Sequence, residues 1–404
     1  VTASIPKRHR NMPYRILARL LRARLKATLD EQQDGFGSAA EFVDDLEAIA
    51  TSLRNNRGQH AGLFLTQRLI WRARTFGFHL ATLDLRQDAL VHRRVIGRAL
   101  GDTSWEDQGA TKRATRLRET LSGPAAAVAR LDREGEAVLD VFRAAREARD
   151  RFGAEAIGPY IVSMARAADD VLSVLVLARW AELCDNDGHV PLDVAPLFET
   201  LEDLEAGAEV LEGLLSDDLY ARHVGRRERR QIVMIGYSDS NKDAGIGAAR
   251  WALHGAETSL ARCADGHEVD LTLFHGRGGT ISRGGGKTHV AAMAAPPGAV
   301  RGVLRVTEQG EIINAKYGLR GVALRTLERA VGSVTQATFG ATPAPPEPSW
   351  EEAMDEVART SAAAYRDLVY ADPAFYGFFR QATPIDVIER MKIGSRPASR
   401  RTGQ

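Results

Sequence analysis

The chain has 404 residues, of which 44% are hydrophobic and 26% are charged, a balance typical of globular proteins with a large core. Its formal net charge of +1 gives no support for a nucleic-acid or membrane partner, and no run of about 18 apolar residues predicts a membrane span. The two cysteines, Cys184 and Cys263, show neither metal-type spacing nor a disulfide framework, which is typical of a reducing cytosol.

The amino-terminal segment, residues 1–70, is predicted to be helical. Phe42, Leu46 and Leu53 recur at helical spacing with acidic residues between them, which predicts an amphipathic helix. The sequence begins without Met or an apolar signal core and stops after a motif-like segment. We therefore expect a piece of a longer, cytoplasmic polypeptide.

A repeating strand–helix pattern is predicted for residues 71–330. Short apolar runs each end in a polar residue, and from Ser163 to Glu308 these polar residues recur every 33 to 40 residues. One strand, one helix and two loops fill such an interval, as in repeated βαβ units. The expected strands and their polar residues are 78–85 with Arg86, 160–162 with Ser163, 194–198 with Glu199, 232–237 with Asp239, 271–274 with His275, and 303–307 with Glu308.

This repeat predicts a helix-rich α/β fold. Its parallel strands either close into a (β/α)8 barrel of the TIM type or form an open doubly wound sheet, and a barrel would bring the polar residues together on one face. A charged helical insertion is expected at about residues 100–150. The third part, residues 331–404, is expected to contain a Pro-rich loop and then a helix that opens with a capping box of Ser349 and Glu352.

The glycine-rich segment 274–286 is the most informative part of the sequence. It contains six glycines, two arginines and one histidine directly after an apolar run, so we expect its backbone to approach a ligand closely. Arg277 and Arg283 favour a phosphate or carboxylate ligand, and His275 adds a group that titrates near neutral pH. The segment does not fit a P-loop, because the first glycine of that motif would fall at Ile281. A flexible surface loop is the alternative.

Carboxylates follow two of the predicted strands. Segment 233–245 leads from a strand into a turn with Asp239, Lys242 and Asp243, which could bind a cation and an anion or simply cap a helix. Glu199 could likewise be a metal ligand or lie in a solvated first turn. Two carboxylates without a Cys/His cluster favour Mg²⁺ or Mn²⁺ over zinc.

With these motifs, the sequence resembles the phosphoenolpyruvate carboxylase family. Segment 233–245 is similar to one of the two defining motifs of that family, and segment 274–286 is similar to its glycine-rich catalytic loop. The sequence departs from the family pattern at Ser282, where Gly is usual, and at Lys287, where Pro is usual. The other defining motif, Thr-Ala-His-Pro-Thr with an essential histidine, does not occur in these 404 residues. Further matching segments are 76–88, 158–165, 196–201, 305–311, 316–319, 380–385 and 393–401.

The resemblance implies a TIM-type barrel with many additional helices, incomplete in this chain. It also implies that bicarbonate attacks the phosphate of phosphoenolpyruvate, giving carboxyphosphate and an enolate, and that the enolate then captures CO₂ to form oxaloacetate. The implied residue roles are Mg²⁺ or Mn²⁺ binding for Glu199 and Asp239, phosphate binding for Arg86, Arg277 and Arg396, substrate binding for Gly278 and Gly279, and catalysis for Lys242, His275 and Arg283.

The resemblance further implies that the full-length parent is a cytoplasmic, homotetrameric carboxy-lyase. Since the essential histidine is missing, we expect the 404-residue chain alone to be nearly inactive. Three alternatives remain at this point. The chain could be a truncated paralogue that binds phosphoenolpyruvate and metal without chemistry, another barrel enzyme acting on a phosphorylated enol or keto acid, or a chain too incomplete to fold.

Overall fold

A computed structural model describes residues 5–123, 131–277, 287–308, 310–340 and 346–391. The chain forms two units. One comprises Val1–Leu85 and Asp140–Gly158, and the other comprises Arg86–Leu139 and Pro159–Gln404. No helix among the described residues is long and apolar enough to cross a bilayer.

Three helices form the core of the first unit, namely α1 (Pro13–Leu29), α2 (Ala39–Asn55) and α3 (Phe64–Phe76). The predicted amphipathic pattern around Phe42 and Leu46 lies in α2, and both side chains are buried. The Ser38 hydroxyl accepts a hydrogen bond from the Glu41 amide and caps α2. The core of these helices consists of Leu21, Phe36, Phe42, Val43, Leu46, Ala50 and Ile70.

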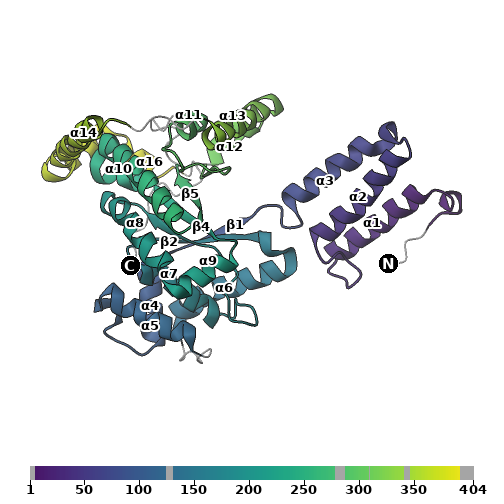
Figure 1. Ribbon diagram of the computed structural model, residues 1–404, viewed down its shortest axis with the longest axis horizontal. Helices are drawn as coiled ribbons and strands as arrows, with labels where there is room; N and C mark the ends of the chain where they lie inside the picture. Colours follow the sequence, from purple (N-terminus) through teal and green to yellow (C-terminus); the bar gives the residue numbers. More distant parts are fainter. Residues whose placement is uncertain (1–4, 124–130, 278–286, 309, 341–345, 392–404) are drawn as a thin grey trace. The chain divides into compact units, whose positions relative to one another are not determined.

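A curled parallel sheet of six strands forms a half-barrel (Figure 1). The strands neighbour one another in chain order, which is the arrangement that right-handed βα units produce. The expectation of an incomplete TIM-type barrel is therefore confirmed. The strands are β1 (Leu83–Asp88), β2 (Ile157–Ser163), β3 (Val194–Phe198), β4 (Arg230–Gly236), β5 (Asp270–Gly276) and β6 (Arg305–Val306).

Alternate residues of the central strands form an apolar cluster on one face of the sheet. Side chains of successive strand residues point to opposite faces, so Met234 of β4 and Phe274 of β5 share this face while Ile235 and His275 point the other way. The second face is covered by helices, as the contact of His275 with Glu257 on α10 (Ser238–Gly266) shows. The cluster consists of Ile161, Ala195, Leu197, Ile232, Met234 and Phe274.

Helices connect the strands, as the 33–40-residue repeat predicts. Helix α7 (Ala168–Trp180) is almost entirely buried because it is apolar on all sides. The predicted insertion region contains helices α5 and α6. The helices between β1 and β5 are α4 (Ala89–Ala99), α5 (Ala110–Ser122), α6 (Arg133–Phe152), α7 (Ala168–Trp180), α8 (Leu201–Leu215), α9 (Asp218–Arg226) and α10 (Ser238–Gly266).

The carboxyl-terminal part is helical, and α14 (Pro348–Arg366) lies alongside α10 (Figure 1). The predicted capping box of Ser349 and Glu352 is wrong. The helix begins one residue earlier, with Glu347 as its N-cap and no side-chain cap, because Pro348 supplies the fixed φ that favours the first helical position. The other helices here are α11 (Thr288–Met293), α12 (Gly310–Tyr317), α13 (Arg320–Phe339), α15 (Phe375–Ala382) and α16 (Ile385–Ile388).

Short helical turns complete the secondary structure. They connect the longer helices or precede strands, and η5 continues α14 by one π-helical turn. These turns are η1 (Lys7–His9), η2 (Gln59–Leu63), η3 (Trp105–Asp107), η4 (Ala154–Ala156) and η5 (Asp367–Ala371).

Candidate active site

Polar side chains from three strand ends meet at the carboxyl edge of the sheet. Arg86 lies in β1 and Glu199 directly follows β3, yet Arg86 Nη2 is 3.1 Å from Glu199 Oε1. The two residues are 113 positions apart in the sequence, so the parallel order of the strands is what brings them together. Asp239, which follows β4, is a hydrogen-bonding neighbour of Glu199. The expected convergence of Arg86, Glu199 and Asp239 is what the structure shows.

The surroundings of Glu199 shift its ionisation. Burial raises the pKa of Glu199, the Arg86 guanidinium opposes that shift, and the adjacent Asp239 carboxyl raises the pKa further. Neighbouring carboxylates disfavour each other's ionised form, and nearby positive charge opposes that effect. Lys242 provides such a charge next to Asp239, because its Nζ is 2.5 Å from Asp239 Oδ1.

The sequence around Glu199 fixes its position. Thr200 and Asp203 form a capping box at the start of α8: Thr200 Oγ1 accepts from the Asp203 amide at 3.1 Å, and Asp203 Oδ2 accepts from the Thr200 amide at 3.0 Å. On the neighbouring strand, a Cβ at Gly236 would lie 3.1 Å from the Cα of Glu199. A glycine at that position therefore allows β4 to pass close beside the carboxylate.

The turn that carries Asp239 and Lys242 is held by α14. Helix α10 is interrupted at Gly245, whose φ of 77° is one that side-chain-bearing residues rarely adopt. The Tyr370 hydroxyl donates a hydrogen bond to the Lys242 carbonyl oxygen at 2.6 Å. Arg366 Nη2 lies 2.9 Å from Asp243 Oδ1. These contacts fix a short helical turn separate from the rest of α10.

His275 belongs to a second, buried cluster. Its Nδ1 lies 2.8 Å from the hydroxyl of Tyr237 and 3.7 Å from Glu257 Oε1 on α10. The Tyr237 hydroxyl is also a hydrogen-bond partner of Glu257. The guanidinium of Arg277 lies over the Tyr237 ring, 5.5 Å from its centroid, and Arg250 lies near the same ring at 5.1 Å.

Burial disfavours the charged forms of His275 and Glu257 in this second cluster. It lowers the pKa of His275 to about 4, with a smaller contribution from the positive charge of Arg277. It raises the pKa of Glu257 to about 7, although the Tyr237 hydrogen bond and nearby arginines oppose the shift. At neutral pH the imidazole is therefore neutral, and Glu257 is close to half protonated.

The two clusters have different partners. The alternation of β5 places His275 toward α10, whereas Arg86, Glu199 and Asp239 meet at the strand ends. A cavity of about 20 Å³ beside Tyr237, His275 and Arg277 has room for one water molecule. Among the predicted site residues, Gly278, Gly279, Arg283 and Arg396 lie outside the described part of the chain.

Sequence reasoning did not identify Tyr237 and Glu257 as members of the site. A usable signal existed for Glu257, because it occupies a position on the apolar face of α10 that otherwise carries Leu253, Leu260 and Ala264. An acidic residue at such a position is rarely buried without a partner. The sequence contained no comparable indication that Tyr237 belongs to the site, since a tyrosine at the end of an apolar strand is commonly part of the hydrophobic core.

The chemistry of the first cluster fits a hard divalent cation. Glu199 is buried and Asp239 is its direct neighbour, and carboxylate oxygens are the ligands that Mg²⁺ and Mn²⁺ prefer. A cation between the two groups would compensate for the burial of the Glu199 carboxylate and for its repulsion by Asp239. Arg86 and Lys242 add fixed positive charge on either side of the pair, as the binding of a phosphorylated anion requires.

The family model described as phosphoenolpyruvate carboxylase matches residues 1–404. The chain belongs to the phosphoenolpyruvate carboxylase family. It is 52% identical over 403 residues to the phosphoenolpyruvate carboxylase of Xanthomonas euvesicatoria pv. vesicatoria, covering 98% of this chain and 44% of that protein. It is 40% identical to the protein of the same name from Nocardia farcinica, covering 98% of this chain and 46% of the relative.

A more distant relative has the same name and a similar coverage. The phosphoenolpyruvate carboxylase of Nitrosomonas europaea is 36% identical over 423 residues, which cover 98% of this chain and 45% of that protein. The chain thus spans less than half the length of the phosphoenolpyruvate carboxylases that it matches.

Proposed function

We propose that this chain is the part of a phosphoenolpyruvate carboxylase that binds the divalent cation and the phosphate of phosphoenolpyruvate. The complete enzyme forms oxaloacetate and phosphate from phosphoenolpyruvate and bicarbonate, as a carboxy-lyase. One observation carries the proposal: the neighbouring carboxyls of Glu199 and Asp239 lie between the cations of Arg86 and Lys242 at the carboxyl edge of the sheet. The reaction itself is proposed from membership of the phosphoenolpyruvate carboxylase family.

The first step transfers the phosphoryl group. An oxygen of bicarbonate attacks phosphorus, the bond to the enol oxygen breaks, and the products are carboxyphosphate and the enolate of pyruvate. The Arg86 guanidinium neutralises charge on the phosphoryl oxygens. When bound through Glu199 and Asp239, Mg²⁺ or Mn²⁺ supplies Lewis-acid stabilisation of the enolate oxygen. Arg86 is paired with Glu199 in the structure. When Glu199 binds the cation instead, the Arg86 guanidinium is available to bind the phosphate.

The second step forms the carbon–carbon bond. Carboxyphosphate releases CO₂ and phosphate, and the methylene carbon of the enolate attacks CO₂. The Lys242 ammonium lies next to Asp239 and stabilises negative charge that develops on the substrate. His275 is proposed to contact bicarbonate or CO₂. Since its Nδ1 is engaged by Tyr237, Nε2 is the nitrogen left for that contact.

The remaining residue roles are proposals from the family resemblance. Arg277 and Arg396 would bind phosphate, Gly278 and Gly279 would approach the substrate, and Arg283 would stabilise the carboxylation step. On the same basis we propose Mg²⁺ or Mn²⁺ as the cofactor and a cytoplasmic homotetramer as the state of the full-length protein.

A chimera tests the proposed function. These 404 residues replace the matching segment of the Xanthomonas euvesicatoria relative, to which they are 52% identical over 403 residues. We expect bicarbonate-dependent oxaloacetate formation by the chimera, with at least a 100-fold loss of kcat in Lys242→Ala. The matched control is Lys112→Ala, on α5, with unchanged kcat. A folded chimera in which Lys242→Ala keeps full activity would contradict the role of Lys242.

A further inference from the structure

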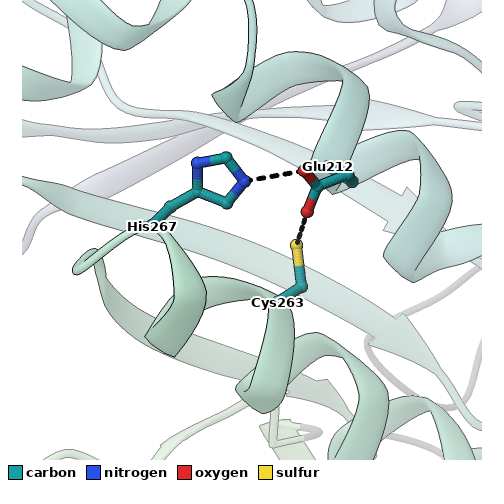
Figure 2. A group of neighbouring side chains, drawn as sticks. All are labelled: Glu212, Cys263 and His267. Atoms are coloured by element: carbon teal, nitrogen blue, oxygen red, sulfur yellow. Dashed lines mark hydrogen bonds and ion pairs between the residues drawn. The ribbon is translucent and has the colours of Figure 1, made fainter.

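Three potential metal ligands converge on a part of the second unit that the proposed reaction does not use. Glu212 lies near the end of α8, and Cys263 and His267 lie at the end of α10 (Figure 2). The three side chains point toward one another, and their ligand atoms all lie within 4.8 Å of one another. Helix α8 starts beside Glu199, and Glu212 follows eleven residues after its first residue, a helical rise of about 16 Å.

The positions of the three residues follow from helix geometry. Cys263 and His267 are four residues apart, so they lie on the same side of α10, one turn from each other. That side of α10 packs along α8. Glu212 therefore faces both residues from the neighbouring helix, as Figure 2 shows.

The distances between the ligand atoms are close to those of a tetrahedral zinc site. His267 Nε2 is 2.9 Å from Glu212 Oε1, and Cys263 Sγ is 3.5 Å from Glu212 Oε2. Around a tetrahedral Zn²⁺, bonded at about 2.0 Å to nitrogen and oxygen and about 2.3 Å to sulfur, one carboxylate oxygen lies about 3.3 Å from the nitrogen and about 3.5 Å from the sulfur. The two contacts here end on different oxygens of Glu212, so binding through a single oxygen requires the carboxylate to rotate.

The set of ligands distinguishes between metals. A thiolate and an imidazole favour Zn²⁺ or other late divalent ions, and they do not suit Mg²⁺ or Ca²⁺. Three protein ligands leave a fourth position for water. The side chain of His267 is 25% exposed and that of Glu212 is 57% exposed, so solvent can reach this position.

A neighbouring hydroxyl already orients the carboxylate. Ser216 Oγ donates a hydrogen bond to Glu212 Oε1 at 3.1 Å, which is the kind of outer contact that fixes ligands in metal sites. In the metal-free state the Cys263 thiol donates a hydrogen bond to Glu212 Oε2. Coordination as a thiolate releases that proton to solvent.

We propose that Glu212, Cys263 and His267 form a binding site for Zn²⁺ that links α8 to the end of α10. The bound ion replaces two hydrogen bonds with three coordinate bonds across the helix pair. The site is separate from the carboxylate pair of Glu199 and Asp239, and it differs from that pair in the metals it prefers.

Cobalt titration of the 404-residue chain tests this site. Co²⁺ takes the same tetrahedral ligands as Zn²⁺ and gives a near-ultraviolet thiolate-to-metal band only when a cysteine is bound. We expect a saturable band equivalent to one Co²⁺ per chain, displaced by Zn²⁺ and unaffected by excess Mg²⁺. The band should be lost in Cys263→Ser, and its affinity should fall at least tenfold in His267→Gln and in Glu212→Gln. The matched control Cys184→Ser should keep it.

A chemical measurement on the unmodified sequence complements the variants. Zn²⁺ should slow alkylation of Cys263 by iodoacetamide at least tenfold and leave alkylation of Cys184 unchanged, as read by peptide mass analysis. The proposal is overturned if the wild-type chain gives no thiolate band, if the band persists in Cys263→Ser, or if Zn²⁺ protects both cysteines equally. These readouts do not depend on carboxylase activity, so they stand apart from the proposed function.

Discussion

Tyr237 connects two buried ionisable groups, His275 and Glu257. Its hydroxyl lies 2.8 Å from His275 Nδ1 and is a hydrogen-bond partner of Glu257. Removing the hydroxyl leaves both groups without this partner, and an unsatisfied buried polar group costs about 1–3 kcal/mol.

We therefore predict that Tyr237→Phe lowers the free energy of unfolding by about 1–3 kcal/mol in urea titrations. The exposed Tyr376 is the control, because Tyr376→Phe should change stability by no more than about 0.5 kcal/mol. Equal stabilities for the two variants would show that the Tyr237 hydroxyl contributes nothing to the cluster.

Glu257 makes the stability of this region depend on pH. Its pKa in the folded chain is about 7, against an ordinary value of 4.5. Between these two values the folded state holds a proton that the unfolded state has released, so the contribution of Glu257 is present below pH 4.5 and is lost as the pH rises toward 7. His275 has the opposite sign, because its folded pKa of about 4 lies below the ordinary 6.5.

A difference measurement separates these two opposing contributions. The free energy of unfolding of the wild-type chain minus that of Glu257→Gln should fall by up to about 3 kcal/mol from pH 4.5 to pH 7. Chemical unfolding at several pH values measures it. A difference that is constant or rises with pH would mean that Glu257 is not a buried carboxyl with a raised pKa.

At the scale of the elements, a buried ion cluster joins α4 and α5 to α7. Arg93 Nη2 lies 2.7 Å from Asp170 Oδ1, and the carboxylate of Asp170 is fully buried. Arg113 Nε lies 2.6 Å from Asp169 Oδ2. Burial and the charge of Asp169 raise the pKa of Asp170, and Arg93 opposes this shift. Arg93 is thus a main counter-charge for a carboxylate that has little access to solvent.

We predict that Arg93→Ala destabilises the chain by about 3–5 kcal/mol, because it leaves a buried charge without its partner. Arg98, on the same helix, pairs with Asp132 and Glu134 on the surface, and Arg98→Ala should cost no more than about 1 kcal/mol. Thermal and urea unfolding of both variants test the contrast. It would be refuted by similar losses at the two positions.

The break in α10 at Gly245 is a second feature at this scale. The backbone at Gly245 has a φ of 77°, which residues with a side chain rarely adopt. A Cβ added there would also lie 3.0 Å from the ring of Tyr365 on α14. We predict that Gly245→Ala costs at least about 1 kcal/mol and weakens cation binding, because the Asp239–Lys242 turn precedes this residue.

Gly255, on the same helix, is the matched control, because a Cβ at that position would meet no atom within 4 Å. Gly255→Ala should therefore be neutral or stabilising by about 0.5–1 kcal/mol. Unfolding titrations and metal titrations of the two variants make the comparison. If both glycines tolerate alanine equally, the break at Gly245 does not position the turn.

The strands could be predicted from the sequence because their apolar runs are short, regularly spaced and followed by polar residues. Each of the six expected runs overlaps a strand, although β6 is only Arg305–Val306 where residues 303–307 were expected.

The start of α14 could not be placed correctly, since Ser349 and Pro348 are both good helix starters and the proline prevails. The sequence could not show which face of β5 carries His275. That assignment required its contacts with Tyr237 and Glu257, which no local sequence pattern contains.

At the scale of the whole molecule, the half-barrel explains how residues far apart in sequence form one site. Parallel strands in chain order align their carboxyl ends, so Arg86, Glu199 and Asp239 meet without any local sequence relation. Three expectations stay predictions: the division of the chain at about residues 70 and 330, the homotetramer, and the cytoplasmic location. The roles of Arg283 and Arg396 also stay predictions, since both residues lie outside the described ranges.

The central claim is that Glu199 and Asp239 bind the divalent cation on which phosphoenolpyruvate binding depends. The most direct test is Mn²⁺ titration of the 404-residue chain, followed by the loss of the free Mn²⁺ electron-spin resonance signal, with and without phosphoenolpyruvate. We predict saturable binding that phosphoenolpyruvate strengthens, at least tenfold weaker in Glu199→Gln and in Asp239→Asn, and unchanged in the control Glu202→Gln on α8. Equal Mn²⁺ affinity in the wild-type chain and Glu199→Gln would contradict the account.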